Sequence, residues 1–242
     1  MKRLFDFFLS LLGVIILLPL IISFSFLIFL QDLKNPFYIA SRVGKNGVPF
    51  NMIKFRSMII NASASGVDST ASDDQRITTI GRIVRKFKID EIPQLFNVMI
   101  GEMSFVGPRP NVVSETRMYS KVEQRILTVK PGITDFSSIV FSDEGDILEG
   151  SDDPDLKYNQ IIRPWKSRLA LLYIDNRTLI IDIKIIIWTL LGVFSKKRVL
   201  KNITNFLRSI KSDNLLIEVC KRVEEPIAFH PPGFNKIISK RN

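Results

Sequence analysis

The sequence is poor in the side chains that many enzymes use as nucleophiles or metal ligands. Its 242 residues include one cysteine, Cys220, and one histidine, His230. A single cysteine excludes an intrachain disulfide. A Ser-His-Asp triad, a Cys-His pair or a zinc site would have to depend on these two residues near the C-terminus. If the protein is an enzyme, we therefore expect carboxylates, arginines and an oxygen-liganded metal to do the chemistry. Mg²⁺ fits that inventory.

Acidic residues are also in the minority. The chain has 34 Lys and Arg against 24 Asp and Glu, which gives a formal net charge of +10. Such a charge favours an anionic partner: nucleic acid, acidic phospholipid or a phosphorylated small molecule. Composition does not choose among the three. Hydrophobic residues make up 46% of the chain, which excludes a disordered protein.

Charge is absent from one long N-terminal run. Residues 9–30 contain no charged side chain, which is enough for a membrane helix and too long for the apolar part of a signal peptide. Pro19 removes a backbone hydrogen bond from the middle of this helix and favours a kink. Lys2 and Arg3 precede the run and Lys34 follows it. A helix that enters one leaflet, bends and returns, and a helix that spans the bilayer, both remain open.

The most informative stretch is residues 88–110. Asp90 and Glu91 are adjacent, and Pro93 suits the first turn of a new helix. The acid pair would then precede a helix N-terminus, which favours carboxylate or phosphate. A Gly-Pro-Arg-Pro loop follows, and its prolines present Arg109 from stiff backbone. The cations just before the acid pair are Arg82, Arg85, Lys86 and Lys88. Acids, cations and a rigid arginine so close together predict a site for phosphate chemistry.

Elsewhere the patterns are coarser. Two short strands around residues 44–47 predict a β-hairpin. Residues 141–155 carry seven acids and are expected to form a solvated loop. Residues 166–197 read as two helices. The second is expected to lie in the membrane interface, with Trp188 at headgroup depth and the cations 196–198 reaching anionic lipid. A buried core helix is the alternative for this segment.

These features together resemble the bacterial sugar transferase family, the monotopic phosphoglycosyl transferases. The resemblance covers roughly residues 1–194. Its most specific parts are Asp-Glu-x-Pro-Gln-x-x-Asn from Asp90 and the Gly-Pro-Arg-Pro loop. The other matching parts are the proline-broken N-terminal helix, Arg42-Val-Gly44, residues 50–58, Asp73-Asp-Gln-Arg76, Gly81-Arg-Ile-Val-Arg85, Lys130-Pro-Gly-Ile-Thr134 and the helix that contains Asp182-Ile-Lys184.

The resemblance implies a reaction. A hexose 1-phosphate would pass from a nucleotide diphosphate sugar, such as a UDP-sugar, to a polyprenyl phosphate such as undecaprenyl phosphate, with release of a nucleoside monophosphate. Asp90 would be the nucleophile and would form a phosphosugar–aspartyl intermediate. Glu91 would assist it, and Mg²⁺ held by Asp90 would neutralise the diphosphate. The cations expected to bind substrate are Arg42, Lys54, Arg56, Arg76, Arg85 and Arg109.

The resemblance also implies an organisation. We expect an α+β, mostly helical fold with a membrane helix at 1–33, a catalytic domain at 34–200 and a basic tail at 201–242. The expected place is the cytoplasmic face of the bacterial inner membrane, in the first membrane step of a surface glycan such as exopolysaccharide or lipopolysaccharide. Anionic lipid and a second copy of the chain, in a homodimer, are the expected further partners, whereas nucleic acid is not expected.

Two departures and one alternative accompany this hypothesis. Leu18 stands before Pro19, where family members commonly have serine. Asp135-Phe-Ser-Ser and the acidic segment replace a common Gly-Leu-x-Gln, in a region expected to bear on the donor or the acceptor, so the identity of the hexose does not carry over. The alternative is a membrane-tethered basic module that binds anionic lipid or nucleic acid without catalysis, with cations spread along a face.

Overall fold

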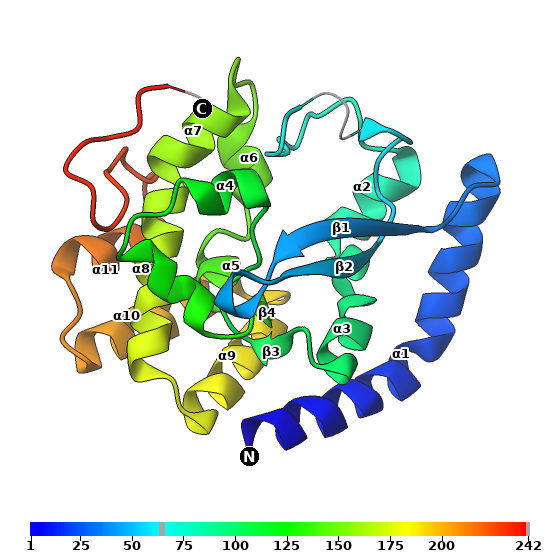
Figure 1. The fold of residues 1–242 in the computed structure, drawn as a ribbon, viewed down its shortest axis with the longest axis horizontal. Helices are drawn as coiled ribbons and strands as arrows, with labels where there is room; N and C mark the ends of the chain where they lie inside the picture. The colour runs from blue at the N-terminus through cyan, green and yellow to red at the C-terminus, as the bar shows by residue number, and fades with distance from the viewer. Residues whose placement is uncertain (63–65, 241–242) are drawn as a thin grey trace.

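The computed structural model describes residues 1–62 and 66–240, and it confirms the predicted α+β, mostly helical fold (Figure 1). The only sheets in the described residues are the antiparallel hairpin β1–β2 and the parallel pair β3–β4. The elements, with η for 3₁₀ helices, are α1 (Lys2–Asp32), β1 (Phe37–Val43), η1 (Lys45–Gly47), β2 (Pro49–Phe55), α2 (Thr79–Lys86), η3 (Ile89–Glu91), α3 (Gln94–Ile100), β3 (Ser104–Val106), α4 (Val113–Arg117), η4 (Glu123–Thr128), β4 (Gly132–Thr134), α5 (Phe136–Val140), α6 (Glu144–Leu148), α7 (Pro154–Ile161), α8 (Arg163–Asn176), α9 (Leu179–Gly192), α10 (Lys196–Ser209) and α11 (Asn214–Lys221).

The largest core lies among the C-terminal helices. Trp165 and Leu169 of α8 are fully buried against Ile203 of α10 and Leu216 of α11. The boundary expected at residues 200/201 therefore falls inside α10, and the described part of the expected tail includes helices that complete this core. Burial of such side chains stabilises the fold by roughly 1.5–3 kcal/mol each.

α9 has two apolar faces with different surroundings. Asp182 and Ile185 are buried, and the ring of Trp188 packs against Phe136 and Phe206 at centroid distances of 6.4 and 6.2 Å. Trp188 is thus partly buried against the C-terminal core, and its depth in the membrane interface stays a prediction. The exposed apolar side chains of the other face are Ile180, Ile183, Ile187 and Leu190.

α1 is fastened to the rest of the molecule at its N-terminal end. Lys2 Nζ donates to Asp182 Oδ2 at 2.6 Å and to the Val106 carbonyl at 3.1 Å. The Tyr173 hydroxyl also donates to Asp182, at 2.6 Å. Asp6, in the next turn, accepts from a backbone amide of β3 at 3.1 Å. The first turns of α1 are thus tied to the strand that leads into the Arg109 loop.

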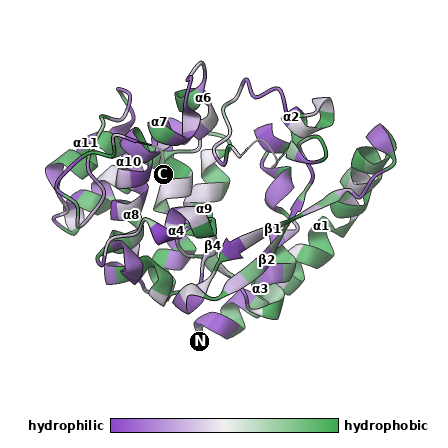
Figure 2. Ribbon diagram, turned by 45° about the horizontal axis from the view of Figure 1, so that its top comes forward, coloured by the Kyte–Doolittle hydropathy of each residue, from purple (hydrophilic) through white to green (hydrophobic). Residues whose placement is uncertain are grey.

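The C-terminal end of α1 is fastened to the same body. Arg56 Nη2 donates to Asp32 Oδ1 at 2.6 Å, and Ile28 is only 1% exposed against β2 and α2. Between these ends Figure 1 shows α1 bent around α3, and Figure 2 shows hydrophobic residues along most of its length. α1 is long and apolar enough to cross a membrane, and only 11% of its most apolar 18-residue segment is buried. Both of its ends nevertheless contact the rest of the described chain.

A buried ion pair joins η4 to α8, and we expect the stability of the fold to depend on it. Arg163 Nη2 lies 3.1 Å from Glu123 Oε2, with side chains 1% and 0% exposed, and Ser167 donates to Glu123 at 2.8 Å. Glu123→Gln leaves the buried arginine without its counterion, so we expect the free energy of unfolding to fall by about 3–5 kcal/mol. The measurement is denaturation in detergent followed by circular dichroism.

A neighbouring pair provides the control. Arg125, also on η4, binds Asp175 with both side chains about half exposed. Asp175→Asn should cost less than about 1 kcal/mol. Equal losses in the two variants would contradict the assignment of the Glu123 pair as the stabilising one.

Candidate active site

Asp90 and Glu91 lie where the chain changes direction between α2 and α3. Lys88 adopts a left-handed conformation (φ 56°) after α2 ends, and η3 then carries both acids in one turn. Pro93 is the N-cap of α3. The predicted position of the acid pair, just before a helix N-terminus, is thus confirmed. The turn brings both carboxylates to Lys54 of β2.

Glu91 is bound by two cations from distant segments. Arg109 Nη2 donates to Glu91 Oε1 at 2.6 Å, and Lys54 Nζ donates to the same oxygen at 3.4 Å. Burial by itself raises the pKa of Glu91, but Arg109 and Lys54 outweigh it and hold that pKa well below its usual range. Glu91 in turn raises the pKa of Arg109. Glu91 is therefore an ionised group that fixes the positions of both cations.

Asp90 has a different environment although it is the adjacent residue. Lys54 Nζ is 3.8 Å from Asp90 Oδ2, which is an ion pair without a hydrogen bond. Asp90 Oδ1 is buried and accepts no hydrogen bond from any residue that the structure describes. Burial raises the pKa of Asp90, and the charge of Lys54 opposes that rise. A buried carboxylate oxygen without a partner is unusual and indicates a group that a ligand completes.

Two more of the predicted cations lie near this pair. Arg42 of β1 is half-buried, and burial lowers its pKa. The positive charge of Arg109 is close enough to lower that pKa further. Arg85, in the last turn of α2, adds its positive charge to the surroundings of Asp90. Together with Lys54, these side chains form a cationic site that suits a diphosphate. The acids within it break up any continuous basic face, which disfavours the alternative of a nucleic-acid-binding module.

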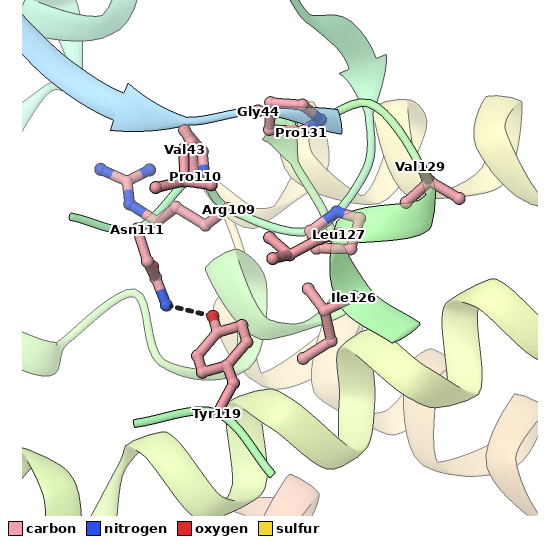
Figure 3. Close-up of a pocket in the computed structure, with 11 residues that line it drawn as sticks. Val43, Gly44, Arg109, Pro110, Asn111, Tyr119, Ile126, Leu127, Val129 and Pro131 are labelled. Carbon is pink, nitrogen blue, oxygen red and sulfur yellow. Dashed lines mark hydrogen bonds between the residues drawn. The ribbon is translucent and has the colours of Figure 1, made fainter. Parts of the chain in front are cut away.

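The loop that presents Arg109 is held by a close approach of two backbones. A Cβ on Gly132 would lie 2.1 Å from the amide nitrogen of Gly107, so a side chain cannot fit there. Behind the loop is a cavity of about 10 Å³, close to the minimum for one water molecule. Beside it Asn111 donates to the Tyr119 hydroxyl at 2.7 Å (Figure 3). Figure 3 also shows the Arg109 side chain extending away from the apolar residues of this cavity. The arginine is thus directed toward Glu91.

Two of the predicted substrate cations are not brought to this site. Arg56 holds Asp32 at the end of α1. Arg76 donates to Asp74 Oδ2 at 2.6 Å and to two loop carbonyls. Both arginines therefore have acidic partners other than Asp90 and Glu91, and their part in substrate binding stays a prediction.

Two acids near the site lie outside the predicted set. Residues 141–155 are not the solvated loop that we expected, because α6 and the start of α7 fold there. Glu144 begins α6, pairs with Lys166 and lies in the field of Arg109. Glu115 of α4 is buried enough to raise its pKa to about 7. The run of acids is a signal that could have pointed to Glu144, whereas no motif in the sequence marks Glu115.

The carboxylates of the site can be tested for their ability to bind the expected Mg²⁺. Within the described part of the chain, no group of three or more His, Cys, Asp and Glu could hold a metal. Mg²⁺ does not need such a group, because it commonly binds one or two carboxylates plus substrate phosphates. The uncommitted Oδ1 of Asp90 fits that mode. Glu91 fits it less well, since its Oε1 already binds two cations.

Comparison with known proteins identifies the family. Residues 1–196 match the model of a family described as bacterial sugar transferase. A Bacillus subtilis protein named as a candidate undecaprenyl-phosphate N-acetylgalactosaminyl 1-phosphate transferase is 48% identical over 109 residues, 45% of this chain and 61% of that protein. The uncharacterized sugar transferase EpsL of Bacillus subtilis is 35% identical over 193 residues, 78% and 85%. The undecaprenyl-phosphate galactose phosphotransferase of Salmonella typhimurium is 34% identical over 204 residues, 78% and 39%.

Several of these relatives are longer than the region they share with this chain. The matches cover 61% of the first relative and 39% of the Salmonella protein. The family model nevertheless extends from α1 to the first residue of α10 and contains every residue of the site described above. The chain therefore belongs to the bacterial sugar transferase family.

Proposed function

We propose that the protein transfers a hexose 1-phosphate from a nucleoside diphosphate sugar to undecaprenyl phosphate, through a covalent intermediate on Asp90. The observation that carries this proposal is the buried, unpartnered Oδ1 of Asp90 beside the Glu91–Arg109 ion pair. A carboxylate with an uncommitted oxygen, placed among cations, can attack a phosphorus atom that the cations hold. The names of relatives, such as the UDP-glucose:undecaprenyl-phosphate glucose-1-phosphate transferase of Klebsiella pneumoniae, support the same substrate classes.

In the first step, a carboxylate oxygen of Asp90 attacks the β-phosphorus of the donor. An Asp–O–P bond forms and the bond from that phosphorus to the bridging oxygen breaks, so a nucleoside monophosphate leaves. Arg109 and Lys54, fixed by Glu91, stabilise negative charge on the phosphoryl oxygens as it develops. Because these cations are already in place, little reorganisation is needed during the reaction.

In the second step, an oxygen of the lipid phosphate attacks the same phosphorus. The Asp–O–P bond breaks, the carboxylate is restored, and a polyprenyl diphosphate sugar is released. Two half-reactions suit substrates of such different solubility, since each can be bound in turn. Asp90 Oδ1 and the phosphates of the donor would hold Mg²⁺, which would supply charge neutralisation when two anions meet.

The attachment of α1 supports a helix that enters and leaves the membrane on one side. Lys2 and Asp32, near its two ends, bind Asp182 and Arg56 of the same domain. A spanning helix would separate these ends by a hydrocarbon layer of about 30 Å. Pro19 lies at the middle, where a bend is easiest. We therefore infer a re-entrant helix with the domain on the cytoplasmic face.

The exposed apolar face of α9 supports contact of the domain with lipid. The cations of α10 that follow it suit anionic headgroups, and Lys197, Arg198 and Lys201 are exposed. A place in the first membrane step of a surface glycan follows from the proposed acceptor. A homodimer stays a prediction.

The role of Asp90 has a direct test. Asp90→Asn should lower release of nucleoside monophosphate by roughly 10³-fold or more, because the amide is a poor nucleophile. The exposed Asp152 supplies the matched control, and Asp152→Asn should retain activity. Mass spectrometry of wild type quenched during turnover should find the phosphosugar on Asp90. Full turnover by the Asp90 variant would remove it from the nucleophile role.

The pH profile tests the electrostatics of the same residue. Asp90 must be ionised to attack, and burial raises its pKa while Lys54 lowers it. Lys54→Met removes the lowering influence, so the acid limb of kcat/KM should move to higher pH. Lys236→Met, at an exposed site, changes the net charge equally and should leave that limb in place. An unshifted or downward-shifted limb in the Lys54 variant would contradict the assignment.

The topology is tested by labelling with a membrane-impermeant thiol reagent. The native Cys220 is fully buried, and burial raises its pKa to about 12, so background labelling should be low. A cysteine inserted after Met1 and a cysteine in place of Lys34 should both react in inverted vesicles and neither in intact spheroplasts. Ile22→Cys, in the membrane part, should react in neither. Labelling of the two ends from opposite sides would establish a spanning helix.

A further inference from the structure

Four polar side chains form a wall beside the cations of the site. Glu144 of α6 pairs with Lys166 of α8, and Lys166 Nζ lies 5.4 Å from the centroid of the Tyr158 ring. Tyr158 and Glu115 of α4 lie close enough for each to influence the pKa of the other. We call Glu115, Glu144, Tyr158 and Lys166 the acidic wall. It combines helices that are far apart in sequence, so it exists only in the folded chain.

The acidic wall is electrostatically linked to the catalytic residues. Burial raises the pKa of Glu144, but Lys166 and Arg109 outweigh it and bring that pKa below its usual value. Glu115 lies in the field of Arg42, and Arg42 in turn lies in the field of Arg109. These mutual effects need proximity, because the interaction of separated charges is screened by solvent. The wall therefore lies near Arg42 and Arg109, two cations of the site.

One atom of the wall lacks a partner. Oε1 of Glu115 is buried and accepts no hydrogen bond from the described residues. Leaving a buried acceptor unsatisfied costs about 1–3 kcal/mol, so such an atom indicates that a donor group arrives with a ligand. The wall as a whole is not sealed, because the Glu144 side chain remains 31% exposed.

The chemistry of the wall limits what that ligand is. Two carboxylates repel a phosphate, so the diphosphate belongs with Arg109 and Lys54. A metal is also disfavoured, because Glu144 is already paired with the Lys166 ammonium, whose positive charge repels a cation. Carboxylates, a phenol and an ammonium suit a neutral group with many hydroxyl or amide N–H donors. The hexose of the donor is such a group, and it is bonded through one oxygen to the phosphorus that Asp90 would attack.

We propose that the acidic wall binds the hexose ring of the donor and determines which sugar is transferred, with Glu115 and Glu144 accepting hydrogen bonds from it. This inference rests on the proposed function. Glu144 belongs to the acidic segment 141–155, and the other three residues of the wall lie outside it. Because the two acids can accept hydrogen bonds from hydroxyl groups at particular positions of the ring, the wall would distinguish hexoses that differ at those positions.

Kinetics with paired donors test this role. The substitutions Glu115→Gln and Glu144→Gln keep side-chain volume and remove one acceptor charge, and Tyr158→Phe removes only a hydroxyl. We expect kcat/KM for the preferred donor relative to its C4 epimer to change by roughly tenfold or more in the first two variants, mainly through KM. Inhibition by UDP, which has no hexose, should be unchanged. Donors are UDP-glucose, UDP-galactose and their N-acetylated forms.

The controls separate this inference from the proposed function. Glu218→Gln, at an exposed acid on α11, should leave all donor ratios unchanged. Unchanged ratios in the three wall variants, or UDP inhibition that weakens in parallel with donor binding, would overturn the role of the wall alone. Absence of nucleoside monophosphate release by wild type with every donor would overturn the proposed function and this inference with it. If one variant fails to fold, the other two decide.

Discussion

The ion pair between Glu91 and Arg109 is the constraint on which the site depends. It joins the turn after α2 to the loop after β3, and these segments share no strand or helix. The same Glu91 oxygen also holds Lys54 of the hairpin, so three parts of the chain meet at one atom. Such a pair within a partly buried site is fixed by hydrogen bonding as well as by charge. The cations can therefore be in position before a substrate arrives.

The adjacent carboxylates Asp90 and Glu91 have different partners and therefore different electrostatic environments. Glu91 is saturated with cations, whereas Asp90 keeps a free oxygen and a raised pKa. Pairs of titratable groups driven apart by their surroundings commonly take different catalytic roles. Here the difference arises from a single turn of 3₁₀ helix, because consecutive residues point in different directions. The backbone of η3 thus separates an acid that two cations hold from an acid with an uncommitted oxygen.

Local motifs predicted the centre of the site well and its borders poorly. Asp90, Glu91 and Arg109 stand within a short stretch whose prolines restrict the backbone, so their proximity followed from nearby sequence. Arg56 was expected to bind phosphate as well, but in the structure it forms an ion pair with Asp32 of α1. A sequence does not show such competition. It shows only the types of side chain that compete.

The remaining differences have the same origin in tertiary packing. Trp188 has the amphipathic character of an interfacial residue, and one part of its ring packs against two phenylalanines from other helices, which no local pattern indicates. Glu115 and Glu144 act on Arg42 and Arg109 only in the folded chain, where α4 contacts β1 and α6 contacts α7. The division of residues 166–197 into two helices was predicted correctly, because apolar periodicity is a local signal, although the first helix already begins at Arg163.

The double fastening of α1 has a consequence for how the protein reaches its membrane. A helix whose charged termini stay on one side carries no ionised group through the hydrocarbon during insertion, so the largest energetic barrier to membrane entry is absent. In the proposed re-entrant arrangement only the bent apolar middle would enter the bilayer, and it could do so after the domain has folded. Membrane insertion would then consist of the docking of a folded protein onto one leaflet and would not require translocation of a chain segment across the bilayer.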